Sequence, residues 1–292
     1  MLAANLQTQS NWQAELRLQF GCDEGRTVLR SRRSRGPLVV QKPLYPEGDS
    51  VCHIYLIHPP GGVVGGDSLQ LEMVLEARAK VLLTTPGATK FYRSAGAAAT
   101  QRQSLTIGAD AALEWLPQDT ILFSGSQVEM ATTVQLEKTA RFIGWDMTCL
   151  GLPASGDRYT SGSLDQQYQI LRGAEPLLIE RNRYLPKHNL SHNPAHDPSH
   201  DLLQAQWGLA GNTVVATLYA VPATTAMLGL VRDNLSPREG VRCASTCLND
   251  VLVFRCAGRS AEQCRELLVQ VWKLLRQPVL QRAVCVPRIW NT

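Results

Sequence analysis

Histidines, which are common metal ligands, are concentrated in one late segment of the chain. Four of the six histidines fall within 13 residues, at His188, His192, His196 and His200. A spacing of four would align them on one face of a helix, but Pro194 and Pro198 stand between them and disfavour a helix. Neutral imidazole suits nickel, copper and zinc. The segment therefore predicts a loop that binds metal weakly and exchangeably, with a solvated polar loop as the alternative.

A glycine-rich segment from His58 to Asp67 invites comparison with phosphate-binding loops. Its glycines are Gly61, Gly62, Gly65 and Gly66. A Walker loop needs Lys and then Ser or Thr after its second glycine, whereas Asp67 and Ser68 stand here, and an aspartate would repel phosphate. Strand periodicity follows, so the helix N-terminus that binds an anion is also missing. The segment predicts a sharply turned loop that brings one carboxylate to a surface or channel, or a purely structural turn.

A second polar segment, residues 83–94, surrounds the turn Pro86-Gly87. Its polar members are Thr84, Thr85, Thr89, Lys90, Tyr92, Arg93 and Ser94. Basic, aromatic and hydroxyl groups on a rigid turn are typical of a contact surface. The sequence contains no GxSxG motif, and only His53 and His58 lie outside the late histidine segment. A serine hydrolase therefore has little support.

A weak repeat of an aliphatic residue, three turn-like residues and an alanine occurs four times. The alanines are Ala79, Ala111, Ala140 and Ala174, separated by 32, 29 and 34 positions. Such spacing suits a strand-turn-strand unit that stacks on copies of itself, although any long meander produces similar hairpins. If the units stack, the residues six positions after each alanine should line up, namely Thr85, Pro117, Asp146 and Glu180.

The elements that must position these groups follow two different periodicities. From Trp12 to Tyr184 the apolar period is two, which predicts strands. Residues 207–292 predict a β-α-β-β-α unit, with strands at 214–221, 241–247 and 251–256 and a helix at 224–235. The last helix is expected to begin after Ser260 and to end at Pro278. The sequence thus predicts a mainly β fold of stacked strands (1–185), a His/Pro-rich loop (186–206) and a small α+β unit with two helices (207–292).

Charge and composition exclude several classes of protein. The net charge of +4, from 29 basic and 25 acidic residues in 292, is too small to predict binding to nucleic acid or membranes. The arginines between Arg26 and Arg35 favour a solvated edge strand over an anion site. We expect a cytoplasmic protein, because no signal peptide or membrane span is evident. The eight cysteines form no CxxC pair, which predicts small buried hydrophobes rather than a zinc site.

Several long motifs resemble one known family. They are YPEGDSVCHIYLIHPPGGVVGGDSL, LLTTPGATKFYRS, EWLPQDTILF, GWDMTCLGLPASGDRY, EPLLIERNRY and VPRIW. Collinear from about Trp12 to Trp290, they are similar to the urease accessory protein UreD family, also called UreH. The resemblance implies a mainly β fold and a non-catalytic scaffold in the maturation of a nickel enzyme. It further implies that the chain binds apo-urease and UreF, which docks the GTPase UreG, and that Ni²⁺ passes transiently through an internal tunnel without a tightly bound cofactor.

That role suggests a use for the candidate residues. Hydrated Ni²⁺ in transit should meet several weak oxygen ligands rather than one tight site. We therefore expect Asp67, Thr85, Ser94, Asp146 and Glu180 to line or flank the route. The alternative is that they cap turns or pair with Arg93, Arg181 or Arg183.

Two other classes of function stay open. One is a hydrolase or transferase that uses the Gly-Gly-Asp loop, and the other is a basic nucleic-acid-binding module. The glycine loop and the segment around Lys90, Tyr92 and Arg93 are the expected partner contacts.

Overall fold

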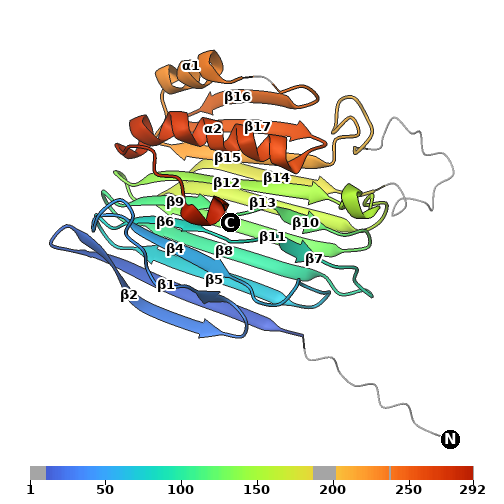
Figure 1. Cartoon of the computed structure of the whole chain (residues 1–292), viewed down its shortest axis with the longest axis horizontal. Helices are drawn as coiled ribbons and strands as arrows, with labels where there is room; N and C mark the ends of the chain where they lie inside the picture. The colour runs from blue at the N-terminus through green and yellow to red at the C-terminus, as the bar shows by residue number, and fades with distance from the viewer. Residues whose placement is uncertain (1–10, 187–201, 237, 292) are drawn as a thin grey trace, which may run out of the picture.

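Two β-sheets form most of the molecule, as the period of two predicts (Figure 1). The computed structural model of the protein describes residues 11–186, 202–236 and 238–291. Within these residues two α-helices lie late in the chain, α1 (Thr225–Asn234) before the last two strands and α2 (Ala261–Leu280) after them. Two short 3₁₀ helices, η1 (Pro153–Ser155) and η4 (Arg288–Asn291), complete the elements named here. The mainly β fold class is confirmed. None of the helices in the described segments is both long enough and apolar enough to span a membrane.

The seven-stranded sheet, here called the outer sheet, has the strand order β14-β13-β11-β8-β5-β1-β2. The bounds are β1 (Gln13–Asp23), β2 (Arg26–Arg35), β5 (Ser68–Leu75), β8 (Ala99–Ile107), β11 (Gln127–Leu136), β13 (Ser163–Arg172) and β14 (Glu175–Tyr184). Its five central strands are parallel, and β2 and β14 pair antiparallel at the two edges. The prediction that the arginine run forms an edge strand is confirmed.

The ten-stranded sheet, here called the central sheet, has the order β16-β17-β15-β12-β9-β6-β4-β3, with β10 beside β12 and β7 beside β10. The bounds are β3 (Val39–Val40), β4 (Cys52–Ile57), β6 (Lys80–Thr84), β7 (Thr89–Phe91), β9 (Ala112–Leu116), β10 (Thr120–Leu122), β12 (Arg141–Leu150), β15 (Val214–Val221), β16 (Arg242–Leu248) and β17 (Val251–Gly258). Its strands β4, β6, β9 and β12 are parallel.

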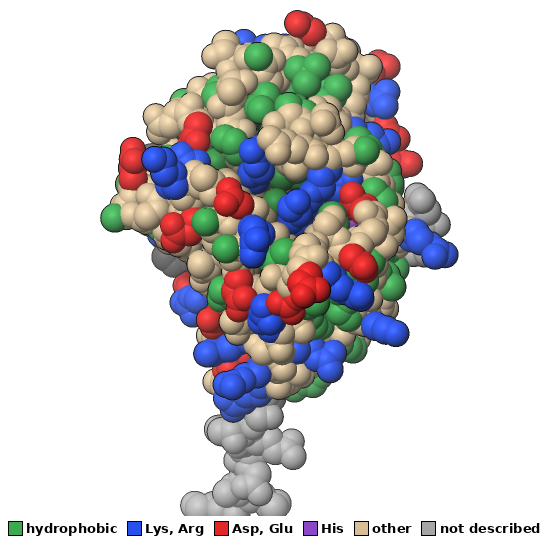
Figure 2. All heavy atoms as spheres, turned by 90° about the vertical axis from the view of Figure 1, so that its left-hand side faces the viewer, with side chains coloured by type: hydrophobic (Ala, Val, Ile, Leu, Met, Phe, Trp, Pro, Cys, Tyr) green, Lys and Arg blue, Asp and Glu red, His purple; other side chains and the backbone are tan. Residues whose placement is uncertain are grey.

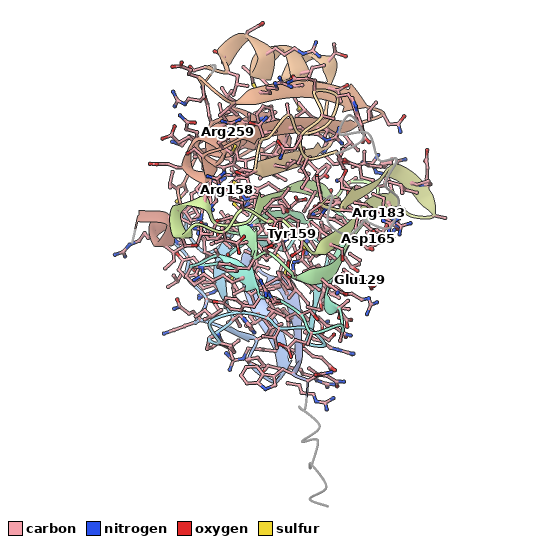
Figure 3. All side chains as sticks on the ribbon, turned by 90° about the vertical axis from the view of Figure 1, so that its right-hand side faces the viewer. Glu129, Arg158, Tyr159, Asp165, Arg183 and Arg259 are labelled. Atoms are coloured by element: carbon pink, nitrogen blue, oxygen red, sulfur yellow. The ribbon has the colours of Figure 1, made fainter. Side chains whose placement is uncertain are left out.

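The chain coils between the two sheets, because strands of the central and outer sheets alternate along the sequence from β4 to β13. Because these alternating strands are parallel within each sheet, the chain always passes from the outer to the central sheet at the same end of the stack. This end, here called the turn end, is at the left of Figure 1. Figure 2 views this end, where acidic and basic side chains are interspersed. The longer loops, 58–67, 85–98, 117–126 and 151–162, meet at the opposite loop end, which Figure 3 views.

The central sheet is buried on both faces, and alternate side chains of a strand therefore enter two different cores. In β6, Val81 and Leu83 pack between the sheets, whereas Leu82 packs toward α2. Helix α2 contributes Leu267, Trp272 and other buried residues to this second core. Continuous apolar runs such as Val81–Leu83 reflect this double burial.

The C-terminal region follows the predicted β-α-β-β-α order. Its strands join the central sheet through the β12–β15 pairing, and the division of the chain into three parts stays a prediction. The Ser260 side chain accepts a hydrogen bond from the Gln263 N–H at 3.3 Å, as the capping signal indicates. The expected helix end at Pro278 is wrong, because α2 continues to Leu280. Val279 and Leu280 are buried there, which offsets the one hydrogen bond that proline removes.

A buried charged network joins α2 to the central sheet. The fully buried Arg276 guanidinium contacts the Glu114 carboxylate on β9 at 3.0 Å, and its Nη2 donates to Glu47 at 2.6 Å. The Trp272 indole N–H also donates to Glu114, at 2.7 Å. Since a buried charge that loses its partner is strongly destabilising, this network fixes how the helix sits on the sheet.

We expect Arg276→Met to lower the free energy of unfolding by about 3 kcal/mol, because it leaves the Glu114 carboxylate without its guanidinium partner. Urea denaturation followed by tryptophan fluorescence measures the change. The matched control is Arg17→Met, which breaks the exposed Arg17–Glu72 pair and should cost less than about 1 kcal/mol. Equal losses in the two variants would contradict a dominant role for the buried network.

Candidate functional site

Strand registers test the alignment that the repeat predicts. β6 pairs with β9 through Thr84 and Leu116, and β9 pairs with β12 through Trp115 and Gly144. Continued along the strands, these registers align Thr85, Pro117 and Asp146 across the central sheet, and all three line one cavity. The alignment of the first three copies is therefore confirmed.

The prediction that the fourth copy of the repeat stacks on the first three is wrong. Ala174 lies in the hairpin between β13 and β14, within the outer sheet, instead of at a crossing between the sheets. Glu180 therefore belongs to β14 and does not continue the row on the central sheet. Glu180 nevertheless lies near Asp146, close enough to influence its protonation. The two acids come together across the sandwich, which a linear repeat does not describe.

The cavity lies between the sheets at the loop end and has a volume of about 200 Å³. It has room for several water molecules, since the share of one water in the liquid is about 30 Å³. Residues at the loop end that line it include His58, Gly61, Gly62, Thr85, Gln118 and, from β7, Lys90. The inner face of the outer sheet contributes Gln101, Gln103, Thr132, Gln166 and Tyr168. Polar groups from both sheets thus surround an interior space that could hold hydrated ions.

Asp146 is the cavity-lining residue whose protonation the fold alters most clearly. The Gln166 amide donates to its Oδ1 at 3.2 Å. The pKa of Asp146 is raised to about 7, mainly by burial and also by the charge of Glu180, while the Gln166 hydrogen bond and the charge of Arg255 oppose the rise. The carboxyl group can therefore gain or lose a proton near neutral pH.

Glu180 is held by partners that the sequence interpretation did not include. Its carboxylate accepts a hydrogen bond from the Tyr219 hydroxyl at 3.0 Å and forms an ion pair with Arg255 on β17. The expected partner Arg181 pairs instead with Asp165, and Arg183 Nε lies 3.4 Å from the same carboxylate. Figure 3 labels Arg183 and Asp165 next to each other.

Two stacked tyrosines complete the surroundings of the acids. Tyr168 and Tyr219 have ring centroids 4.2 Å apart. The buried hydroxyl of Tyr168 has no hydrogen-bond partner. It adds a polar group beside Asp146 at the inner end of the cavity.

The remaining acid and hydroxyl candidates contact loop backbone. Asp67 Oδ1 and Oδ2 accept the main-chain N–H groups of Trp12 and Val64, at 2.9 and 3.0 Å. The Thr85 hydroxyl accepts the Gln118 N–H at 2.8 Å, and Ser94 Oγ bonds to Ala97 within its own turn. Asp67 and Ser94 thus hold loops together, which agrees with the turn-capping alternative, while Thr85 also lines the cavity. Their place on a nickel route stays a prediction.

The glycine loop is compact because side chains approach it closely. A Cβ at Gly62 would lie 2.3 Å from the Tyr92 ring, and one at Gly65 would lie 2.2 Å from Ser94 Oγ. Gly66 has φ of +91°, a conformation that favours glycine. The loop therefore packs against the second polar segment, and the two predicted contact motifs form one surface at the loop end.

The basic and aromatic residues of that surface have different environments. Lys90 lines the cavity. Tyr92 is 39% exposed, stacks on Phe123 with ring centroids 5.0 Å apart, and donates from its hydroxyl to the Gly61 carbonyl at 3.2 Å. The Arg93 side chain packs against Gly125. A partly exposed aromatic ring on a rigid support is suited to protein contact.

Several cavity residues escaped the sequence interpretation. Gln166 and Tyr168 occupy inward positions of β13, between the apolar Leu164 and Ile170. Thr132 takes the equivalent place in β11, in register with Tyr168. The missing signal was a polar residue at an inward position of an alternating strand, which becomes informative only when neighbouring strands are known.

Other candidate sites have different outcomes. The four histidines His188, His192, His196 and His200 lie outside the described residues. In the edge strand β2, Arg26, Arg30 and Arg35 form ion pairs with Asp49, with Asp23 and Glu76, and with Glu15, respectively. These acids neutralise much of the basic run, which supports a solvated edge over a nucleic-acid site.

Comparison with known proteins agrees with the motif series. The family described as "UreD urease accessory protein" matches residues 13–291. The chain is 42% identical over 287 residues to a urease accessory protein UreD of Alcanivorax borkumensis, covering 96% of this chain and 92% of that protein. It is 43% identical over 286 residues to the UreD of Azoarcus sp. strain BH72, covering 97% and 95% of the two chains. The UreD of Klebsiella aerogenes is 39% identical over 284 residues, with 97% and 98% covered. This chain belongs to the UreD family of urease accessory proteins.

Proposed function

We propose that this chain is a non-catalytic scaffold that binds apo-urease and UreF, with UreG docked on UreF, and that passes Ni²⁺ through its interior to the urease active site. The observation that carries the proposal is the cavity between the two sheets, which is lined by both polar and apolar groups and reaches from the loop end to Asp146. Family membership supports the accessory role. Nickel is a transient cargo in this proposal.

The chemistry of the cavity suits a hydrated cation in transit. No cysteine is among its lining residues, which include His58, Lys90 and Arg102 as well as side-chain amides, hydroxyls and one carboxyl that offer oxygen ligands. Such ligands attract Ni²⁺ without replacing its waters permanently, and passage requires sites that are weak enough to leave. Lys90 adds a cationic group near the loops, which disfavours tight retention of a cation, whereas burial lowers the pKa of His58 and favours its neutral form. Glu180 lies beyond the cavity, and its pairing with Arg255 keeps its charge partly compensated.

We expect Asp146→Asn and Glu180→Gln to lower the nickel content and specific activity of co-expressed urease by about tenfold. A carboxylate attracts a cation at 4 Å by about 1–4 kcal/mol in wet protein, and about 1.4 kcal/mol corresponds to tenfold in rate. The measurement is metal analysis and urea hydrolysis on the purified enzyme. Asp165→Asn is the matched control, because this acid lies beside Gln166 in β13 but pairs with Arg181 instead of facing the cavity. Full activation of urease by both acid variants in normally assembled complexes would reject the route.

The raised pKa of Asp146 predicts a pH dependence. Because this pKa is about 7, the carboxyl is mostly neutral at about pH 6 and mostly ionised at about pH 8. Ni²⁺ binding by the isolated chain should therefore strengthen as the pH rises across this interval. Calorimetry at both pH values measures the change in Ni²⁺ affinity for the native chain and for Asp146→Asn. The difference between these two changes is the contribution of the Asp146 carboxyl. Identical pH profiles for the native chain and the variant would contradict the assignment.

The loop-end surface formed by the glycine loop and by Lys90, Tyr92 and Arg93 predicts a partner contact. We expect the double variant Tyr92→Ser, Arg93→Glu to reduce co-purification of apo-urease or UreF by about tenfold or more, since contact aromatic and arginine residues often contribute over about 1.4 kcal/mol. Ile179→Ser is the control, because Ile179 is 63% exposed on β14. Unchanged capture of both partners would place the interface elsewhere. Salt-sensitive retention of nucleic acid without capture of urease would instead support the nucleic-acid alternative.

A further inference from the structure

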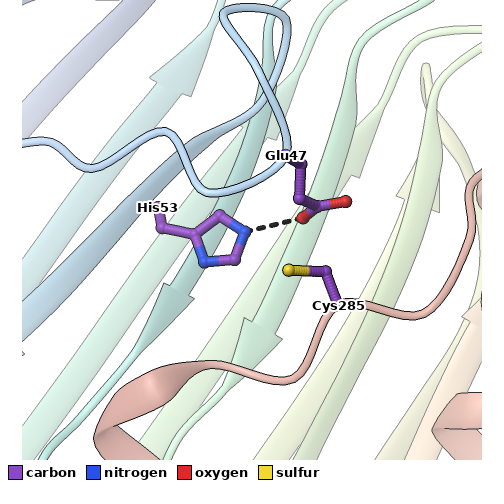
Figure 4. Close-up of side chains that lie close together, drawn as sticks. All are labelled: Glu47, His53 and Cys285. Atoms are coloured by element: carbon purple, nitrogen blue, oxygen red, sulfur yellow. Dashed lines mark hydrogen bonds and ion pairs between the residues drawn. The ribbon is translucent and has the colours of Figure 1, made fainter.

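A second group of metal-ligating side chains lies on the opposite face of the central sheet from the cavity. Glu47 comes from the loop before β4, His53 from β4, and Cys285 from the segment after α2 (Figure 4). The neighbours of His53 in β4, Cys52 and Ile54, face the core between the sheets, so His53 faces α2. One ligand atom of each residue lies within 4.8 Å of the other two.

These separations suit one shared cation. Zinc lies about 2.0–2.3 Å from oxygen, nitrogen and sulfur ligands, so tetrahedral ligand atoms lie roughly 3.3–3.8 Å apart. His53 Nε2 and Glu47 Oε1 are now 2.7 Å apart and would separate slightly around an ion. Only small side-chain movements are required, because each residue belongs to an element that is already in place.

The ligand atoms are available for coordination. Arg276 Nη2 and His53 Nε2 both contact Oε1 of Glu47, so a bound cation would take the place of the His53–Glu47 hydrogen bond while Arg276 continues to hold the carboxylate. His53 is fully buried, and its Nδ1 has no hydrogen-bond partner. Because Nδ1 accepts no hydrogen bond, nothing there requires the ring proton to stay on Nε2. The proton can therefore move to Nδ1 when Nε2 binds a metal.

The local charges also tolerate a dication. Arg276 contacts Glu47 and Glu114, and Arg282 lies close enough to interact electrostatically with both carboxylates. Burial raises the pKa of the Cys285 thiol, so a metal ion must displace its proton on binding. With Cys285 then a thiolate, three negative charges face two guanidinium groups. A divalent cation then leaves an excess of one positive charge, at a place where Glu47 and Cys285 are partly exposed to solvent.

We propose that Glu47, His53 and Cys285 form a binding site for one borderline divalent cation, Ni²⁺ or Zn²⁺, with a fourth position open to water. A nitrogen, an oxygen and a sulfur ligand together suit this class of metal and disfavour Mg²⁺ or Ca²⁺. The site is separate from the interior cavity and does not depend on the proposed nickel route. A bound ion would connect the segment after α2 to β4 and so stabilise the folded chain.

The test uses Co²⁺ as a spectroscopic probe of the purified full-length chain. We expect a thiolate-to-metal charge-transfer band that saturates at one Co²⁺ per chain, and displacement of this Co²⁺ by Ni²⁺ or Zn²⁺ identifies the preferred ion. Cys285→Ser should abolish the band. Glu47→Gln and His53→Gln should weaken Co²⁺ binding by at least the 10- to 100-fold that loss of an outer-shell partner costs.

Matched controls separate this site from other metal ligands. Cys22→Ser removes another partly exposed thiol and should leave the band unchanged. Asp146→Asn and replacement of the four late histidines by alanine should also preserve it, because only a thiolate produces the band.

Absence of the band in the native chain, or its persistence in Cys285→Ser, would overturn the site and leave a metal-free ion-pair network. If His53→Gln does not fold, the partly exposed Cys285→Ser and Glu47→Gln still decide the question. Loss of urease activation in Asp146→Asn with an intact band would separate the two metal proposals.

Discussion

Burial of the central sheet on both faces is the constraint on which the rest of the structure depends. One face packs against the outer sheet and the other against α2, so buried charged groups on its inner strands need partners. Glu114 meets this requirement through Arg276 and Trp272 on the helix side. Asp146 meets it on the other side through Gln166 and the space of the cavity. Glu114 and Asp146 are thus polar groups that remain buried in the sheet because each has a partner.

Parallel coiling explains why the polar exceptions collect in one place. Because the strands of the stack stay in register, a polar residue at an inward position in one strand lies beside its equivalent in the next. Thr132 and Gln103 are neighbours for this reason, and a 3.2 Å hydrogen bond joins them. The same geometry brings the longer loops to one end, where the cavity is lined by Gly61, Thr85 and Gln118. A polar interior and a contact surface therefore share the loop end.

Prediction from the sequence succeeded where a signal repeats over many residues. The alternation in β1 and β5, the cap at Ser260 and the edge strand rich in arginine are local patterns, and the structure confirms them. It failed where burial decides, as at Pro278, where packing of Val279 and Leu280 extends the helix. For Asp67 the carboxylate accepts two main-chain N–H groups, as the turn-capping alternative predicts, and its place on a nickel route stays a prediction.

The sequence by itself determined the fold class, the family and the set of acids and glycines around which the site is built, because periodicity and long motifs are properties of contiguous residues. Only the tertiary structure decided which of these residues meet. Glu180 pairs with Arg255, and Glu47, His53 and Cys285 converge from segments more than 200 residues apart. These contacts depend on strand register and on the position of α2 on the sheet. Both are set by packing over the whole chain and not by local spacing.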